Sequence, residues 1–583
     1  MGGKALRKVL VVSLLIGVTS LVRAQSFRVQ CPTSTITHPT SANNNSEPAY
    51  NGPTTFTCSV TGGCTAANNV GYLVPNSTTV NGAIKCQQIS GGDGYSTMAD
   101  GTQTFMFSFG PLSGLADIAA GKPGTQFPNV FNTVYTAGTG TLLPGDPATT
   151  DGASDAGSYS AGGSTFNWNG AVGLTPDLDA IGDGTCATPC LDGHVDPRQI
   201  MDVGVMNGNI PAPLIAFDED DEFFLTLTNV GMIMRPDLFE QHTVHFHGYP
   251  NASSFYDGVP DASVAINIGG SFTYYYLSPD AGTYFWHCHI TPPEHLQMGM
   301  VGQLYVRPRQ NRVPSGASLY ATLQQQNGLG TTVDLRTACN PAADILCSAT
   351  MPAVNTGVTQ GMDKLGSPQK YTYNDGDGST AYDVEYPLQI HGFDPNFHFV
   401  GMTFNPEAFV DMKDKYFLLN GRSYPDTASP GPQATQTSDG RMHYSQPLPS
   451  IINIPVGGKA LLRIADLDVT EYQTLASIGI PMKEVGFNAK LLRDQDGNNL
   501  EFYTNSITLG GGESLDVILD ASDAGCGSTG CAATLYPAGS VFYLYTPNLD
   551  HLSNDAENFG GLMTEVHICT SISGGSTFGN TCN

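Results

Sequence analysis

The sequence predicts an all-β protein with two β-sandwich or barrel domains and long loop insertions. Its 583 residues include 68 Gly and 38 Pro but only 13% charged residues. This composition favours a folded chain rich in turns over a coiled coil or a disordered chain. The length exceeds what one core normally fills, so two or more domains are expected. Short segments rich in β-branched and aromatic residues also recur at the spacing of a sandwich.

The predicted strands of the first half are short and closely spaced. Residues 25–95 and 112–200 are dominated by small and polar residues, and we expect long surface loops there. Alternation of polar and apolar side chains, or a run of β-branched and aromatic residues, predicts strands at 102–109, 222–229, 242–247, 271–277, 283–289 and 302–306. The first domain is therefore expected at 25–308.

A second copy of this plan follows a loop-rich connection at about 309–383. The Asn-Gly turn at 420–421 corresponds to the one at 207–208, and residues 460–464 correspond to the strand at 223–228. Residues 539–545 (GSVFYLY) correspond to 282–287 (GTYFWH). The sequence therefore predicts a duplicated β-sandwich with its second domain at 384–583. That copy has Tyr543 to Pro547 where the first has Trp286 to His289, so it lacks the Cys and the paired His.

The N-terminus predicts export. Lys4, Arg7 and Lys8 precede an apolar run that ends in a small-x-Ala pattern, which indicates a signal peptide over residues 1–24 with cleavage after Ala24. The apolar run is too short to span a bilayer, so we expect a secreted, periplasmic or extracellular protein without membrane insertion. The net charge of −28 makes nucleic acid a poor partner, because nucleic acid needs a basic surface.

Thirteen cysteines in an exported chain predict disulfides with one cysteine left over. Close pairs are expected at Cys58/Cys64, Cys186/Cys190, Cys339/Cys347, Cys526/Cys531 and Cys569/Cys582, with Cys31 and Cys86 completing the twelve. The odd residue is Cys288. A lone cysteine is most often a small buried hydrophobe, but Cys288 stands between two histidines, which favours metal binding.

Six of the 13 histidines lie in two short stretches around this cysteine. Side chains at i and i+2 share one face of a strand, so the stretches should form two sites. The first site is expected to contain His242, Cys288, His295 and Met300, a soft ligand set that favours copper. The second is an all-imidazole face made of His245, His247, His287 and His289, which suits copper or zinc and leaves positions open for a small ligand. Cys288 of the first site is joined by one peptide bond to His287 and by one to His289, which both belong to the second site.

Three segments resemble the copper motifs of the multicopper oxidases, a family of the cupredoxin superfamily: His245 to Gly248, Asp257 to Pro260, and residues 282–289. The resemblance is strong over about 200–308, the expected copper-binding core, and continues over 384–568 as a repeat without type 1 ligands. It implies Greek-key cupredoxin domains with type 1 copper at His242, Cys288, His295 and Met300. It also implies type 2/type 3 copper at His245, His247, His287 and His289. Asp257 would lie near a proton path to bound oxygen, and an Asx turn is the alternative explanation of that residue.

The sequence departs from the family pattern in two ways. A full trinuclear cluster needs about eight His from two domains, and the first domain supplies four; His391 and His398 are candidate donors, with ordinary loop positions as the alternative. The spacing from Cys288 to His295 approaches that of copper nitrite reductases, whose type 2 copper is completed across a trimer interface. A homotrimer is therefore a second source of the remaining ligands.

Three functions are compatible with these residues. The leading prediction is an exported copper-dependent oxidoreductase, which takes electrons from a small-molecule or metal-ion reductant at type 1 copper and passes them to a type 2/type 3 centre for dioxygen reduction. The alternatives are a nitrite reductase-like enzyme and an electron-transfer or copper-holding cupredoxin without a catalytic cluster. The sequence leaves the reductant open among a phenol, Mn(II), Fe(II) and Cu(I).

Overall fold

The computed structural model describes residues 35–39, 48–61, 71, 73–112, 158–161, 164–167, 204–250, 253–278, 280–327, 357–401, 408–437, 440–522, 535–555 and 557–583. Among these residues no helix is long and apolar enough to cross a membrane. The expected signal peptide, residues 1–24, lies outside the described residues. Export therefore stays a prediction.

The first domain consists of two four-stranded sheets with the orders β10-β8-β3-β4 and β7-β12-β11-β9. Its strands are β3 (Ile84–Thr97), β4 (Gln103–Pro111), β7 (Ala212–Asp218), β8 (Glu222–Gly231), β9 (His245–His247), β10 (Ser271–Leu277), β11 (Gly282–His287) and β12 (Val301–Arg307). Helices η3 (Ser254–Tyr256) and α5 (Pro292–Gln297) lie in its loops. A core rich in aromatic residues fills this domain, and Phe246 stacks on Tyr276 at 3.8 Å between ring centroids.

The prediction of surface loops over 25–95 is wrong from Ile84 onward. β3 is a strand of 14 residues that pairs parallel with β8 and antiparallel with β4. Its glycines allow close packing: a Cβ added at Gly91 would lie 2.7 Å from Cδ2 of His242, and one at Gly94 would lie 2.8 Å from the Gly208 carbonyl oxygen. The small residues that suggested a loop therefore belong to a buried strand whose neighbours leave no room for side chains.

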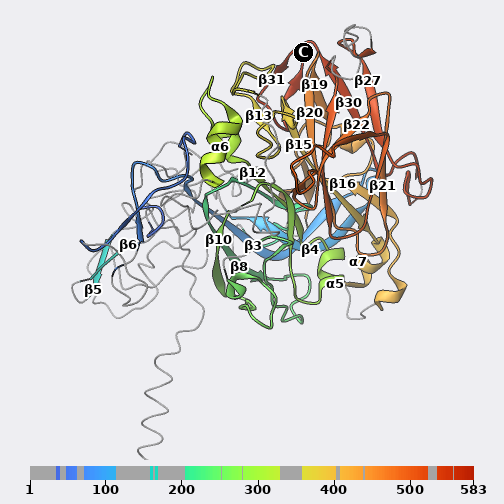
Figure 1. Ribbon diagram of the computed structural model, residues 1–583. Coiled ribbons are helices and arrows are strands. Elements are labelled where there is room, and N and C mark those ends of the chain that lie inside the picture. Colours follow the sequence, from blue (N-terminus) through green and yellow to red (C-terminus); the bar gives the residue numbers. More distant parts are fainter. Residues whose placement is uncertain are drawn as a thin grey trace, which may run out of the picture.

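The second domain repeats the pairings of the first, in agreement with the predicted all-β duplication. Figure 1 shows it in orange and red beside the blue and green strands of the first domain. The parallel pair β15–β20 corresponds to β3–β8, and the parallel pair β19–β30 corresponds to β7–β12. Its strands are β15 (Val384–Phe393), β16 (Tyr416–Leu419), β19 (Ile452–Pro455), β20 (Lys459–Asp466), β21 (Gln473–Ile478), β22 (Met482–Phe487), β23 (Lys490–Leu491), β24 (Phe502–Thr504), β25 (Ser506–Leu509), β26 (Glu513–Asp520), β27 (Val541–Tyr545) and β30 (Met563–Cys569).

Short elements connect and border the two domains. The helices are η4 (Arg309–Arg312), α6 (Leu319–Asn327), α7 (Pro395–Gly401), η5 (Phe409–Asp411) and η6 (Asp426–Ala428). Two-stranded pairs are formed by β1 (Phe56–Cys58) with β2 (Leu73–Pro75), β5 (Ser158–Ala161) with β6 (Ser164–Asn167), β13 (Lys370–Tyr371) with β14 (Ala381–Tyr382), β17 (Gln433–Gln436) with β18 (Met442–Gln446), β28 (Ser553–Asn554) with β29 (Glu557–Asn558), and β31 (Ile572–Ser573) with β32 (Thr581–Cys582).

The two histidine strands are shorter than predicted. β9 begins at His245, and His242 precedes it in an isolated bridge with Ile266. β11 ends at His287, so Cys288 and His289 lie just beyond the strand. The backbone N–H of Cys288 still donates to the Met300 carbonyl at 3.2 Å, so Cys288 stays beside the start of β12.

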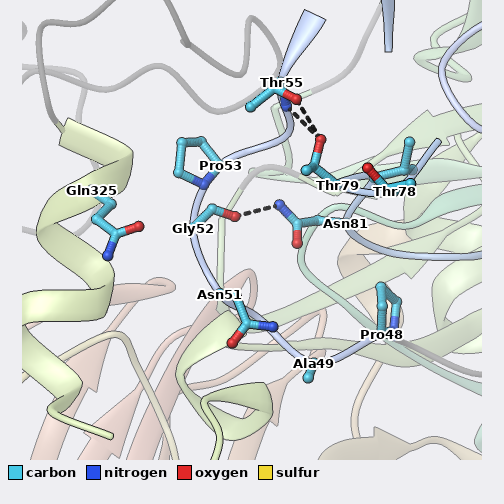
Figure 2. A pocket seen from close by; sticks show the side chains of 11 residues that line it. Pro48, Ala49, Asn51, Gly52, Pro53, Thr55, Thr78, Thr79, Asn81 and Gln325 are labelled. Carbon is cyan, nitrogen blue, oxygen red and sulfur yellow. Dashed lines mark hydrogen bonds between the residues drawn. The ribbon is translucent and has the colours of Figure 1, made fainter. Parts of the chain in front are cut away.

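A cavity of about 280 Å³ lies between two N-terminal loops and α6 (Figure 2). The Asn81 amide donates to the Gly52 carbonyl at 3.0 Å, and the Thr55 N–H donates to the Thr79 hydroxyl at 3.0 Å. The lining contains no charged side chain and none of the eight predicted metal ligands. This cavity is therefore separate from the candidate metal centre.

Candidate metal centre

The first predicted site is a compact, fully buried cluster of His242, Cys288 and His295. One ligand atom from each residue lies within 4.8 Å of the other two. His295 Nδ1 is 3.2 Å from Cys288 Sγ, and the Thr243 N–H donates to the same sulfur at 3.4 Å. Both ring nitrogens of His242 are buried without a hydrogen-bond partner in the structure, and a bound metal would satisfy one of them. A thiolate and two imidazoles fit copper.

Electrostatics favour the ligating form of the cysteine. Burial alone would raise the pKa of Cys288, but the charge on His295, the hydrogen bond with His295 and the nearby His242 imidazole hold it well below its usual value. Burial opposes protonation of His295, yet the charge of Cys288, the hydrogen bond between His295 and Cys288, and the nearby Glu240 carboxylate raise the pKa of His295 to about 10. These interactions favour the thiolate of Cys288, the form that binds metal.

The chain segment after α5 returns Met300 to this cluster. The Met300 N–H donates to the His295 carbonyl at 2.9 Å, and the Met300 carbonyl accepts from Cys288. Met300 is fully buried and shares the core cluster of Cys288. These backbone contacts place Met300 beside Cys288, and its role as a weak axial ligand stays a prediction.

A carboxylate that the sequence reasoning missed lies on the outer side of His295. Glu240 Oε2 is 3.5 Å from His295 Nε2, the ring nitrogen opposite the one that faces Cys288. The imidazole is fully buried, whereas the Glu240 side chain is 26% exposed and the neighbouring Phe239 is 85% exposed. Glu240 thus connects the buried cluster with solvent. Only its position two residues before His242 could have suggested this.

The second predicted site is the imidazole face. Ligand atoms of His245, His247 and His287 lie within 4.8 Å of one another. The ring of His289 lies 5.1 Å from that of His245 and 5.7 Å from that of His287, measured between centroids. The structure therefore separates the histidines into the two groups expected from strand geometry, and their copper binding stays a prediction.

Backbone carbonyls orient two of these rings. His245 Nδ1 is 2.7 Å from the Asp257 carbonyl oxygen, and His287 Nδ1 is 2.7 Å from the Cys288 carbonyl oxygen. Each contact occupies Nδ1, so Nε2 is the nitrogen that could face a metal. In the structure His287 Nε2 lies 3.3 Å from His247 Nδ1. Burial lowers the pKa of His287 to about 3 and that of His247 to about 4, in both cases aided by the other histidines. The rings are therefore neutral at pH 7, as metal ligands must be.

Asp257 lies beside this face, mainly through its backbone. Its carbonyl holds His245, and its carboxylate oxygen Oδ2 is 3.5 Å from the same ring nitrogen. The side chain is 28% exposed. The role of Asp257 in a proton path to bound oxygen stays a prediction.

The candidate donors His391 and His398 are not brought to the imidazole face within the described residues. His398 Nδ1 and Nε2 lie 2.6 Å from the Phe105 carbonyl oxygen and 2.9 Å from that of Gln297. The two nitrogens of His391 lie 3.3 Å and 3.4 Å from the carbonyl oxygens of Leu467 and Gln297. Both rings therefore contact backbone instead of the other histidines.

The cysteine predictions agree with the structure where it can be compared. Cys569 and Cys582 form a disulfide with 5.1 Å between their Cα atoms. Cys58 and Cys86 each take part in a disulfide, as expected for paired cysteines. Among the described residues Cys288 is the free cysteine. The predicted pairs at Cys186/Cys190, Cys339/Cys347 and Cys526/Cys531, and Cys31 and Cys64, lie outside the described residues.

The part of the chain that contains both clusters is similar in sequence to multicopper oxidases. Residues 192–311 match the family model of the multicopper oxidases. Multicopper oxidase MCE of Talaromyces pinophilus is 34% identical over 112 residues, which is 19% of this chain and 17% of its own. Multicopper oxidase MmcO of Mycobacterium tuberculosis is 34% identical over 134 residues, 21% of this chain and 24% of its own. The alignments thus span about a fifth of the length of these relatives.

Among solved structures, the comparison matches the blue copper oxidase from Nitrosomonas europaea. It is 20% identical with a TM-score of 0.38, over 62% of this chain and 78% of its own. The copper nitrite reductase from the same organism is 15% identical with a TM-score of 0.35, over 63% of this chain and 85% of its own.

Proposed function

We propose that the chain is an exported copper-dependent oxidoreductase of the multicopper oxidase kind, which oxidises an external reductant and reduces dioxygen. The match of residues 192–311 to the multicopper oxidase family model supports this proposal. Copper would supply one-electron chemistry by alternating between Cu(I) and Cu(II). His242, Cys288, His295 and Met300 would hold it in the first cluster, and His245, His247, His287 and His289 would hold it in the second.

One observation carries this proposal: the two clusters share a continuous stretch of chain. Cys288 belongs to the buried thiolate cluster, and its sequence neighbours His287 and His289 belong to the imidazole face. One peptide link on either side is therefore the whole covalent separation between the two sites. A protein with a single storage site would not need this adjacency.

The residues around the clusters have distinct tasks. Phe107 packs edge-on against His295 at 5.1 Å between centroids, and Phe109 packs against Trp286 at 4.9 Å, so aromatic rings keep water from the thiolate. Glu240 lies on the solvent side of His295, where its carboxylate can accept a proton from a phenol or attract a metal cation. The reductant would therefore bind near Glu240.

Oxygen uptake tests the proposal. The copper-loaded protein should consume dioxygen with a phenol or with Fe(II), Mn(II) or Cu(I), and Cys288→Ser should abolish this turnover. Nitrite consumption under anaerobic conditions, without oxygen uptake under air, would instead indicate the nitrite reductase-like alternative.

One observation favours the second candidate function, a copper-holding or electron-transfer protein. In the second domain β27 carries Tyr543 and Tyr545 where β11 of the first carries its ligand sequence, so no second imidazole set comes from that strand. One copper per chain and no turnover with any reductant would support this alternative.

A further inference from the structure

Residues of the second domain contact the loop of the first domain that carries the predicted type 1 ligands. α5 lies between Cys288 and Met300 and contains His295 and Gln297. It is only six residues long, starts with two prolines, and its N-cap residue Thr291 has a φ of 38° and no side-chain capping bond. So short a helix cannot hold its own position. Its placement must depend on the residues that contact it.

Four contacts from the second domain converge on Gln297, which is fully buried. Its side-chain amide donates to Asp414 Oδ1 at 2.8 Å, and its side-chain oxygen accepts from the Asp394 N–H at 3.1 Å. Its backbone carbonyl faces His398 Nε2 at 2.9 Å and His391 Nε2 at 3.4 Å. Every polar group of this side chain is therefore bound to the other domain.

His398 joins three elements. Its ring lies between the carbonyl of Phe105 in β4 and that of Gln297 in α5, while the residue itself belongs to α7. The ring also stacks on Phe393 at 3.5 Å between centroids. α7 packs directly against the same loop, because a Cβ added at Gly401 would lie 3.4 Å from the sulfur of Met298. Figure 1 shows α5 and α7 beside each other at the domain boundary.

We propose that the second domain clamps the type 1 ligand loop, with His398 and Gln297 as positioning residues that set how closely His295 approaches Cys288. This inference rests on the proposed copper site. It also gives a role to a domain that carries no type 1 ligands of its own: the domain acts through α5 on the first cluster. His295 is two residues from Gln297 and shares its helix. A displacement of Gln297 therefore moves His295 away from the sulfur, now 3.2 Å away.

The test uses the thiol of Cys288 in the full-length protein without copper, a readout that needs no activity. His398→Leu removes both carbonyl contacts, and Gln297→Met keeps the side-chain volume but removes the amide. Loss of contacts of this kind should raise the rate at which a thiol reagent modifies Cys288 by about tenfold, because the loop opens more often. His567→Leu is the control, since His567 lies in β30 and contacts Glu565.

The copper-loaded variants supply the second readout. His398→Leu and Gln297→Met should shift the charge-transfer band of the thiolate, whereas His398→Gln, which can still donate to one carbonyl, should shift it less. Unchanged thiol reactivity and an unchanged band in both His398→Leu and Gln297→Met would overturn the proposal. If His398→Leu does not fold, Gln297→Met decides alone. Faster thiol modification in a protein that never shows a type 1 band would retain the clamp and refute the copper function.

Discussion

Gly91 in β3 is the position where one added methyl group should disturb the first cluster most directly. An ideal Cβ at this residue lies 2.7 Å from Cδ2 and 3.3 Å from Cγ of His242. The backbone itself tolerates alanine, because Gly91 is not among the glycines with positive φ. The substitution Gly91→Ala therefore acts through the contact with the histidine ring alone.

The size of the effect follows from the geometry. Restoring an ordinary contact of 3.4 Å requires the methyl group and the ring to separate by about 0.7 Å. His242 is fully buried, so a shift of its ring is transmitted to its neighbours in the core. Overpacking of this kind costs about 1–3 kcal/mol of unfolding free energy. Metal sites tolerate changes of only about 0.2 Å in ligand distance, so the displacement exceeds what the copper site accepts.

The assay combines copper analysis, the visible spectrum and urea unfolding of the copper-free protein. Gly91→Ala should lose type 1 copper or show a shifted, weakened band, and its unfolding midpoint should fall. Gly361→Ala is the matched control, because a Cβ there meets nothing within 4 Å and should leave both properties unchanged or slightly raise stability. Wild-type copper content, spectrum and stability in Gly91→Ala would refute the packing of β3 against His242.

Three further predictions concern the ligands and a buried acid. Cys288→Ser should abolish the intense visible band while the copper-free protein stays folded; a retained band would remove Cys288 from the site. Met300→Leu should keep the colour and raise the reduction potential, measured by redox titration, because the axial ligand tunes the site without forming it; an unchanged potential would argue against axial ligation. Burial would raise the pKa of Glu222, but its hydrogen bond and charge interaction with His38 lower it to about 2. Glu222 therefore stabilises the fold above its unfolded pKa of about 4.3, and this contribution is lost as pH falls through about 2. Glu222→Gln should lower the unfolding free energy at pH 7 by about 2–3 kcal/mol and flatten its decrease between pH 5 and pH 2; an unchanged acid unfolding curve would contradict this.

The arrangement of the histidines could be predicted because it depends on neighbours in sequence. Most of the predicted ligands lie in or near strands, and alternation of side chains separates His245 and His247 from His242 without knowledge of the rest of the fold. The same holds for the duplicated plan, whose strands and turns repeat in order. Cys288 as the unpaired cysteine followed from counting and is confirmed among the described residues.

Other features depend on contacts that no local pattern contains. Glu240 is an ordinary surface acid in the sequence, and only the fold brings it to His295. β3 resembled a loop because its glycines are dictated by strands far along the chain. His391 and His398 suggested metal ligands by residue type, yet domain packing directs their rings to backbone carbonyls. Residue type alone does not distinguish a ligand from a hydrogen-bonding core residue.

The number and kind of coppers per chain test the central claim most directly. Metal analysis of the purified holoprotein, together with its absorption and electron spin resonance spectra, counts the two sites separately. The account predicts a type 1 signal from the thiolate cluster and additional copper without type 1 character at the imidazole face, so that more than one copper is bound per chain. Loss of only the type 1 signal in Cys288→Ser would place the two signals at the two clusters. A single copper per chain with purely type 1 spectra, and no oxygen uptake with any reductant, would contradict the account.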